Sequence, residues 1–181
     1  MSLSFYQSWQ NEFSTHPVLK YFWQFWGADS VVLFVPVFFY VLTLPNTKEI
    51  FTLSFLALIL SRGVVKEVIY FFYKKQRPYQ KYHLRPPEFS FFSFTTERPD
   101  SFPSGHPLAL ASIATVVLYF SFWLGIVIYI VSILTAWGRV LIAYHYPEDI
   151  IAGFVLGCIC GGFVLFLYTH SYLPNILNLV K

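Results

Sequence analysis

Five apolar stretches, each near the length needed to cross a lipid bilayer, constrain this chain more than any other feature. A helix crosses the hydrocarbon core with about 20 mostly apolar residues. Lipid leaves backbone groups no water to bond with, so such stretches form helices. The sequence therefore predicts an all-α, polytopic membrane helix bundle with about five transmembrane helices, at residues 28–45, 50–73, 106–121, 123–144 and 149–169.

The composition supports this class of protein. Only 12% of the residues are charged, against roughly 25% in soluble domains. The net charge of +3 is spread among apolar residues, which argues against nucleic acid as a partner. We expect one integral-membrane domain over residues 1–181, with the bilayer as its surroundings and an oligomeric state that the sequence leaves open.

Two segments are too polar to cross the bilayer and too aromatic to lie in water. Residues 1–27 and 74–104 mix aromatic side chains with charges, which is typical of the headgroup region. We expect an N-terminal interfacial helix without a cleaved signal peptide, and an interfacial loop or short helix between spans two and three, over the active site. Cys158 and Cys160 have no companions in a metal-ligand pattern, so no metal or other cofactor is expected.

Alternation of five spans brings the polar residues together. The end of span two, the start of span three, the end of span four and the start of span five all lie on one side of the membrane. The residues of chemical interest stand at these positions, so a site there is expected. Each is ambiguous alone, because an arginine near a helix end also reaches the interface without any function.

The string SFPSGHP opens the third span. Ser104 suits the N-cap, Gly105 allows close approach to the backbone, and Pro107 fits the first turn. The free amides and the positive end of the helix dipole favour an anion there. We interpret this helix start as a phosphate-binding element, with His106 beside it.

Two further strings add cations and a histidine. In GRVLIAYHYPED, Arg139 offers a planar fork that matches two phosphate oxygens. Asp149, four residues after His145, can fix the tautomer of that imidazole and leave its other nitrogen free to attack. In KKQRPYQ, Arg77 before a proline places a guanidinium at the end of the second span.

Taken together, Arg-Pro, Pro-Ser-Gly-His and Arg-x5-His-x3-Asp, in this order over residues 66–153, resemble the type 2 phosphatidic acid phosphatase superfamily. The resemblance implies a metal-independent phosphatase with a phosphohistidine intermediate. It assigns His145 as the nucleophile, Asp149 as its orienting partner and His106 as the general acid. The residues that hold the phosphoryl oxygens are, by the same resemblance, Arg77, Arg139, Ser104 and the Gly105 amide.

The chain departs from the family pattern twice. Tyr70 stands where the family has a lysine, and Gly138 stands where it usually has a serine. Lys66 and Lys74 lie one helical turn to either side of Tyr70 on the expected helix. We expect Lys74 to supply the missing cation, because it is nearer to Arg77 and the membrane surface.

The resemblance to small bacterial members of the family, the undecaprenyl pyrophosphate phosphatases, indicates a lipid phosphate substrate. It implies a bacterial inner membrane with the active site facing the periplasm or outside. Phosphatidic acid, phosphatidylglycerophosphate and lipid A phosphates are alternatives, because all present a similar phosphate. A lipid-phosphate binder or transporter without turnover is the alternative of another class.

Overall fold

A computed structural model describes residues 2–84 and 100–170. The part of the 74–104 segment between residues 85 and 99, with its aromatic cluster, and Lys181 lie outside the described residues. Within these ranges the fold is all-α, and the predicted class of a bundle of apolar helices is confirmed. The described residues contain no β-strand, only an isolated antiparallel bridge between Gln76 and Asp100.

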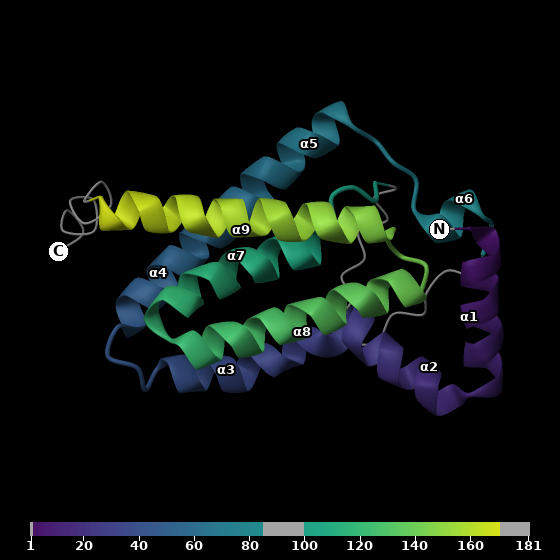
Figure 1. The fold of residues 1–181 in the computed structure, drawn as a ribbon, viewed down its shortest axis with the longest axis horizontal. Coiled ribbons are helices and arrows are strands. Elements are labelled where there is room, and N and C mark those ends of the chain that lie inside the picture. Colours follow the sequence, from purple (N-terminus) through teal and green to yellow (C-terminus); the bar gives the residue numbers. More distant parts are fainter. Residues whose placement is uncertain (1, 85–99, 171–181) are drawn as a thin grey trace.

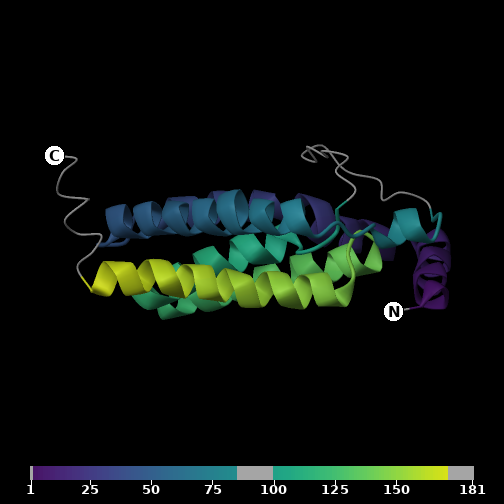
Figure 2. The same ribbon diagram turned by 90° about the horizontal axis from the view of Figure 1, so that it is seen from above.

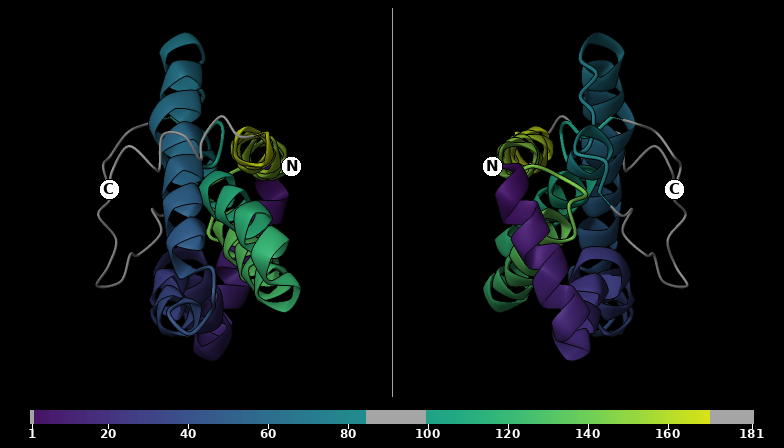
Figure 3. Two further views of the ribbon diagram at one scale, coloured as in Figure 1. Left: turned by 90° about the vertical axis from the view of Figure 1, so that its left-hand side faces the viewer. Right: turned by 90° about the vertical axis from the view of Figure 1, so that its right-hand side faces the viewer.

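The first predicted span, residues 28–45, belongs to a continuous helical run that begins before residue 28. It comprises α2 (Pro17–Gln24), a π-helical segment (Phe25–Asp29), a 3-10 segment (Ser30–Leu33) and α3 (Phe34–Val41). The run passes through residue 27 without a break, so α2 and the expected span form one helical element. Before it, α1 (Leu3–Thr15) lies across the end of the bundle (Figure 1; Figure 3, right).

The second span is a long run inclined to the others. It consists of α4 (Thr47–Leu58), a π-helical segment (Ile59–Val65) and α5 (Lys66–Phe72), and Tyr73 turns to an extended conformation. Figure 1 shows α5 pointing away from the bundle, and Figure 2 shows the whole run in a layer beside α9. A one-turn helix, α6 (Pro78–Lys81), follows.

The remaining spans match their predicted positions closely. They are α7 (Gly105–Phe120), α8 (Phe122–Leu141) and α9 (Pro147–Thr169). Of the described helices, α8 and α9 are long and apolar enough to cross a membrane, with mean hydropathies of 1.9 and 2.6. Large apolar side chains point outward, among them Phe72 at 80% and Trp123 at 78% exposure, as suits a surface that faces lipid.

Helix α7 is the centre of the bundle and packs against α4, α8 and α9. Three glycines on α9 permit its contact with α7. A Cβ atom on Gly153, Gly157 or Gly161 would lie 2.5–2.6 Å from a backbone oxygen of α7. The glycines of α9 thus allow close packing inside the bundle. Because of this packing, the starts of α7 and α9 lie side by side.

Candidate active site

Four chain segments carry the predicted site residues to one end of the bundle, at the right in Figure 1. These are the segment after α5, the start of α7, the end of α8 and the start of α9. The Ser104 amide donates to the Asp149 carbonyl at 3.0 Å, and the Tyr79 amide donates to the Ala143 carbonyl at 3.0 Å. Backbone bonds therefore tie these segments to one another, as the alternation of spans predicted.

Ser104 occupies the N-cap position of α7 but does not cap the helix with its side chain. Its hydroxyl is buried and has no hydrogen-bond partner among the described residues. Burying a hydroxyl without a partner is unfavourable. The free hydroxyl and the free amides of the first helical turn together suit an anion such as phosphate.

The two arginines both lie near one tyrosine ring. The guanidinium carbon of Arg77 is 3.7 Å from the Tyr144 ring centroid, and that of Arg139 is 5.3 Å from it. Both arginines are only 6% exposed. Attraction to the ring face favours each cation, and Tyr144 thereby holds two buried positive charges near each other.

His106 contacts one of these arginines. Nη2 of Arg139 lies 3.0 Å from Nε2 of His106. A guanidinium can only donate, so Nε2 of His106 is the acceptor and carries no proton in this structure. Nε of Arg139 is buried without a hydrogen-bond partner among the described residues, and this leaves donor capacity for a bound anion.

His145 and Asp149 are close but do not bond directly. Nδ1 of His145 is 3.7 Å from Oδ2 of Asp149, which is too long for a hydrogen bond. Burial lowers the pKa of His145 to about 3, and the charges of Arg77 and Arg139 add to this effect while Asp149 opposes it. The imidazole is therefore neutral near pH 7, as a nucleophile must be.

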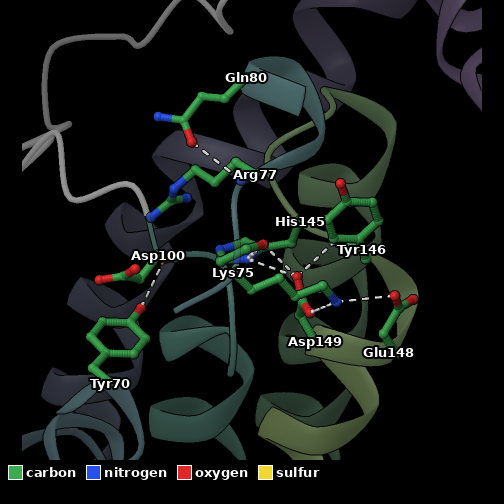
Figure 4. Close-up of polar contacts among 10 residues, drawn as sticks. Tyr70, Lys75, Arg77, Gln80, Asp100, His145, Tyr146, Glu148 and Asp149 are labelled. Carbon is green, nitrogen blue, oxygen red and sulfur yellow. Dashed lines mark hydrogen bonds and ion pairs between the residues drawn. The ribbon is translucent and has the colours of Figure 1, made fainter. Parts of the chain in front are cut away.

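Two residues that the sequence reasoning missed, Lys75 and Ser101, contact Asp149, and Figure 4 shows Lys75 beside the carboxylate. Nζ of Lys75 lies 2.6 Å from Oδ1 of Asp149 and 3.0 Å from Oε1 of Glu148. Burial disfavours the charged form of Lys75, but these two partners outweigh burial and raise its pKa. The hydroxyl of Ser101 bonds to Oδ2 of Asp149 and lies 3.3 Å from Nδ1 of His145.

The lysine beside the start of α7 is Lys66, and not Lys74, which we expected to supply the cation. Nζ of Lys66 lies 2.6 Å from the position that a Cβ atom on Gly105 would take, and 4.7 Å from the Tyr70 ring centroid. Lys74 is exposed and follows the end of α5 at Phe72. The helix geometry that placed Lys74 one turn beyond Tyr70 therefore does not apply.

The departure at Gly138 has a packing cause. A Cβ atom there would lie 2.7 Å from the Gly27 amide nitrogen and 3.0 Å from the Trp23 carbonyl oxygen. The π-helical segment Phe25–Asp29 thus approaches α8 backbone to backbone. A serine at position 138 has no room while this contact exists.

Comparison with known protein families agrees with this geometry. Residues 51–172, more than half of the chain, match the model of the PAP2 superfamily. The chain belongs to this superfamily, which confirms the resemblance drawn from the three motifs.

Two curated relatives share part of the chain. An undecaprenyl-diphosphatase of Sulfolobus acidocaldarius is 40% identical over 58 residues, which cover 32% of this chain and 28% of the relative. The putative undecaprenyl-diphosphatase YbjG of Escherichia coli is 33% identical over 61 residues, which cover 33% of this chain and 31% of the relative. The matched part therefore spans less than a third of either relative. No solved structure matches the chain.

Proposed function

We propose that this protein is a membrane lipid phosphatase that removes the terminal phosphate of a lipid diphosphate through a phosphohistidine intermediate. The observation that carries the proposal is a buried, neutral His145 at the same end of the bundle as two buried arginines and an uncapped helix start. Cations and amides suffice for binding phosphate. An oriented neutral imidazole is needed only for attack on it.

The residues divide into those that hold phosphate and those that react. Arg77, Arg139, the Ser104 hydroxyl and the Gly105 amide hold the phosphoryl oxygens. Lys66, rather than Lys74, adds the cation that the family has at the position of Tyr70. This division suits phosphoryl transfer, in which positioning and stabilisation of charge on the oxygens provide most of the rate.

The reaction proceeds in two displacements. Nε2 of His145 attacks the terminal phosphorus, and the bond from phosphorus to the bridging oxygen breaks while His106 gives that oxygen a proton. Water then attacks the phosphorus of the phosphohistidine while His106 takes a proton from that water. The bond from phosphorus to Nε2 breaks, which releases inorganic phosphate and restores His145. His106 must first carry a proton on Nε2, so its contact with Arg139 has to give way when Arg139 turns to phosphate.

The names of the two relatives support a diphosphate substrate, most directly undecaprenyl diphosphate, with undecaprenyl phosphate as the product. Phosphatidic acid, phosphatidylglycerophosphate and lipid A phosphates are the alternative substrates, because the site recognises phosphate rather than the lipid tail. The apolar outer surface suits a substrate whose tail stays in lipid. We place the protein in a bacterial inner membrane, with the site facing the periplasm or outside.

Phosphate release by the purified protein tests the proposal. Wild type, His145→Ala and a control, His170→Ala, are assayed in detergent with a chelator on an isoprenyl diphosphate, phosphatidic acid and phosphatidylglycerophosphate. His170 is exposed at the far end of α9, so its removal leaves the site intact. We expect chelator-resistant release that is lost in His145→Ala alone and is fastest on the diphosphate.

Two outcomes contradict the proposal. Release that persists in His145→Ala excludes this residue as the nucleophile. Binding of lipid phosphate without release from any substrate identifies the protein as a binder or transporter, the rival function that the same cations would serve.

A further inference from the structure

The contact between the proposed nucleophile and its carboxylate partner is indirect, and a third residue stands between them. Asp149 and Ser101 are completely buried, and His145 is 2% exposed. The carboxylate and Nδ1 of His145 are 3.7 Å apart. Ser101 contacts both, through its bond to Oδ2 of Asp149 and its 3.3 Å approach to Nδ1 of His145.

Both oxygens of Asp149 have fixed partners that keep the carboxylate in place. Oδ1 accepts from Nζ of Lys75 at 2.6 Å. Oδ2 accepts from the Tyr146 amide at 3.0 Å and from the Ser101 hydroxyl. Lys75 keeps the carboxylate ionised because a cation at this distance favours the charged form. A carboxylate in this state accepts hydrogen bonds and donates none.

Counting hydrogen-bond donors shows which atoms in this chain of contacts carry a proton. The Ser101 hydroxyl has one proton and gives it to Asp149, so toward His145 its oxygen can only accept. Nδ1 of His145 must therefore carry the ring proton. The lone pair of the neutral imidazole is left on Nε2, the nitrogen that the reaction requires.

The backbone explains how Ser101 and Lys75 come to lie together. The Ser101 amide donates to the Lys75 carbonyl at 2.7 Å, and the neighbouring residues Gln76 and Asp100 form the antiparallel bridge. This short pairing brings the Lys75 ammonium and the Ser101 hydroxyl to the same carboxylate, although the two residues stand near opposite ends of the segment between spans two and three.

We propose that Ser101 is a positioning residue that transmits the charge of Asp149 to His145 and sets its tautomer, in a chain Asp149–Ser101–His145. When Nε2 gains the phosphoryl group, the ring becomes an imidazolium. Its Nδ1 proton stays on nitrogen and donates to Ser101, and the charge of Asp149 stabilises the cation through the hydroxyl. The kinetic part of this inference rests on the proposed phosphatase function, whereas the tautomer does not.

Nitrogen-15 NMR of histidine-labelled protein in detergent tests the tautomer without any activity. We expect the His145 signals, assigned by their loss in His145→Ala, to show Nδ1 protonated and Nε2 unprotonated at pH 7. In Ser101→Ala we expect a mixture of tautomers. Ser132→Ala is the matched control, because Ser132 is equally buried and its hydroxyl has no partner among the described residues. A proton on Nε2 in wild type overturns the proposal even if Ser101→Ala fails to fold.

A double-mutant cycle tests the chain of contacts kinetically. Ser101→Ala is expected to lower kcat by about tenfold to a hundredfold, the effect of one hydrogen bond to a charged group, with KM little changed. In an Asp149→Ala background the same change is expected to cost nothing further, since the charge to be transmitted is gone. If the losses in kcat from the two single changes multiply in the double variant, the proposal is overturned. Absence of release by wild type instead contradicts the proposed function and leaves the NMR result to decide the tautomer.

Discussion

At the scale of single residues, the site places a positive charge beside the positive end of a helix. The ammonium of Lys66 lies against Gly105, where the dipole of α7 is already positive. It takes part in no ion pair among the described residues. The ring of Tyr70 offers it a weak attraction. Such an arrangement is favourable only with an anion present, which is the reason to assign Lys66 to phosphate binding.

Lys66→Ala is expected to lower kcat/KM for phosphate release by about tenfold to a hundredfold, the cost of losing one charge-assisted contact. Lys74→Ala, the matched control, is expected to keep the wild-type value because Lys74 is exposed. Kinetics of both variants on the same isoprenyl diphosphate decide between the lysines. The reverse pattern would restore the sequence-based assignment of Lys74.

The difference between these lysines shows where sequence reasoning stopped. Hydropathy and the order of the motifs predicted the helices and the meeting of Arg77, His106, Arg139 and His145. The choice of lysine assumed a regular helix through residue 74. The π-helical segment Ile59–Val65 and the end of α5 at Phe72 break that regularity, and neither has a clear sequence signal. The contacts of Ser101 and Lys75 depend on a pairing of segments distant in sequence, which spacing alone does not predict.

At the scale of helices, the distance between α7 and α9 sets the geometry of the site. Gly153 lies one turn after Asp149, and a Cβ atom on it would be 2.6 Å from the Ser104 carbonyl oxygen. The same two helix starts are joined by the bond from the Ser104 amide to the Asp149 carbonyl. Any separation here moves Ser104, which we propose to bind phosphate, away from the carboxylate of Asp149.

Gly153→Ala is therefore expected to lower both activity and stability, by roughly 1–3 kcal/mol of overpacking in the unfolding free energy. Gly162→Ala on the same helix is the control, because a Cβ atom there meets nothing within 4 Å. Thermal unfolding in detergent and phosphate release are measured on both. Equal behaviour of the two variants would show that the close packing of α7 and α9 does not position the site.

At the scale of the whole molecule, the two ends of the bundle differ in character. One end carries the site, α1 and α6, and the other carries the connection between α3 and α4 (Figure 1). The exposed Lys48 follows this connection, in the first turn of α4. Basic residues gather at the site end, and such residues usually mark the cytoplasmic side. Several of them are assigned here to phosphate or to Asp149, so their number is a poor guide to orientation.

Cysteine labelling of whole cells with a membrane-impermeant reagent tests the proposed orientation. In a background without Cys158 and Cys160, Lys81→Cys on α6 is expected to react from outside, and Lys48→Cys only after the cells are opened. Both should react in detergent, which controls for accessibility. Labelling of Lys48→Cys in intact cells would place the site in the cytoplasm.

The backbone contact between Gly27 and Gly138 links two regions that are remote in sequence. The residue before Arg139 is restricted in size by the π-helical segment Phe25–Asp29. A related chain whose N-terminal helices lie elsewhere is free to carry serine before this arginine. The two glycine positions are therefore expected to covary, so that an exchange at one is tolerated only together with a rearrangement at the other.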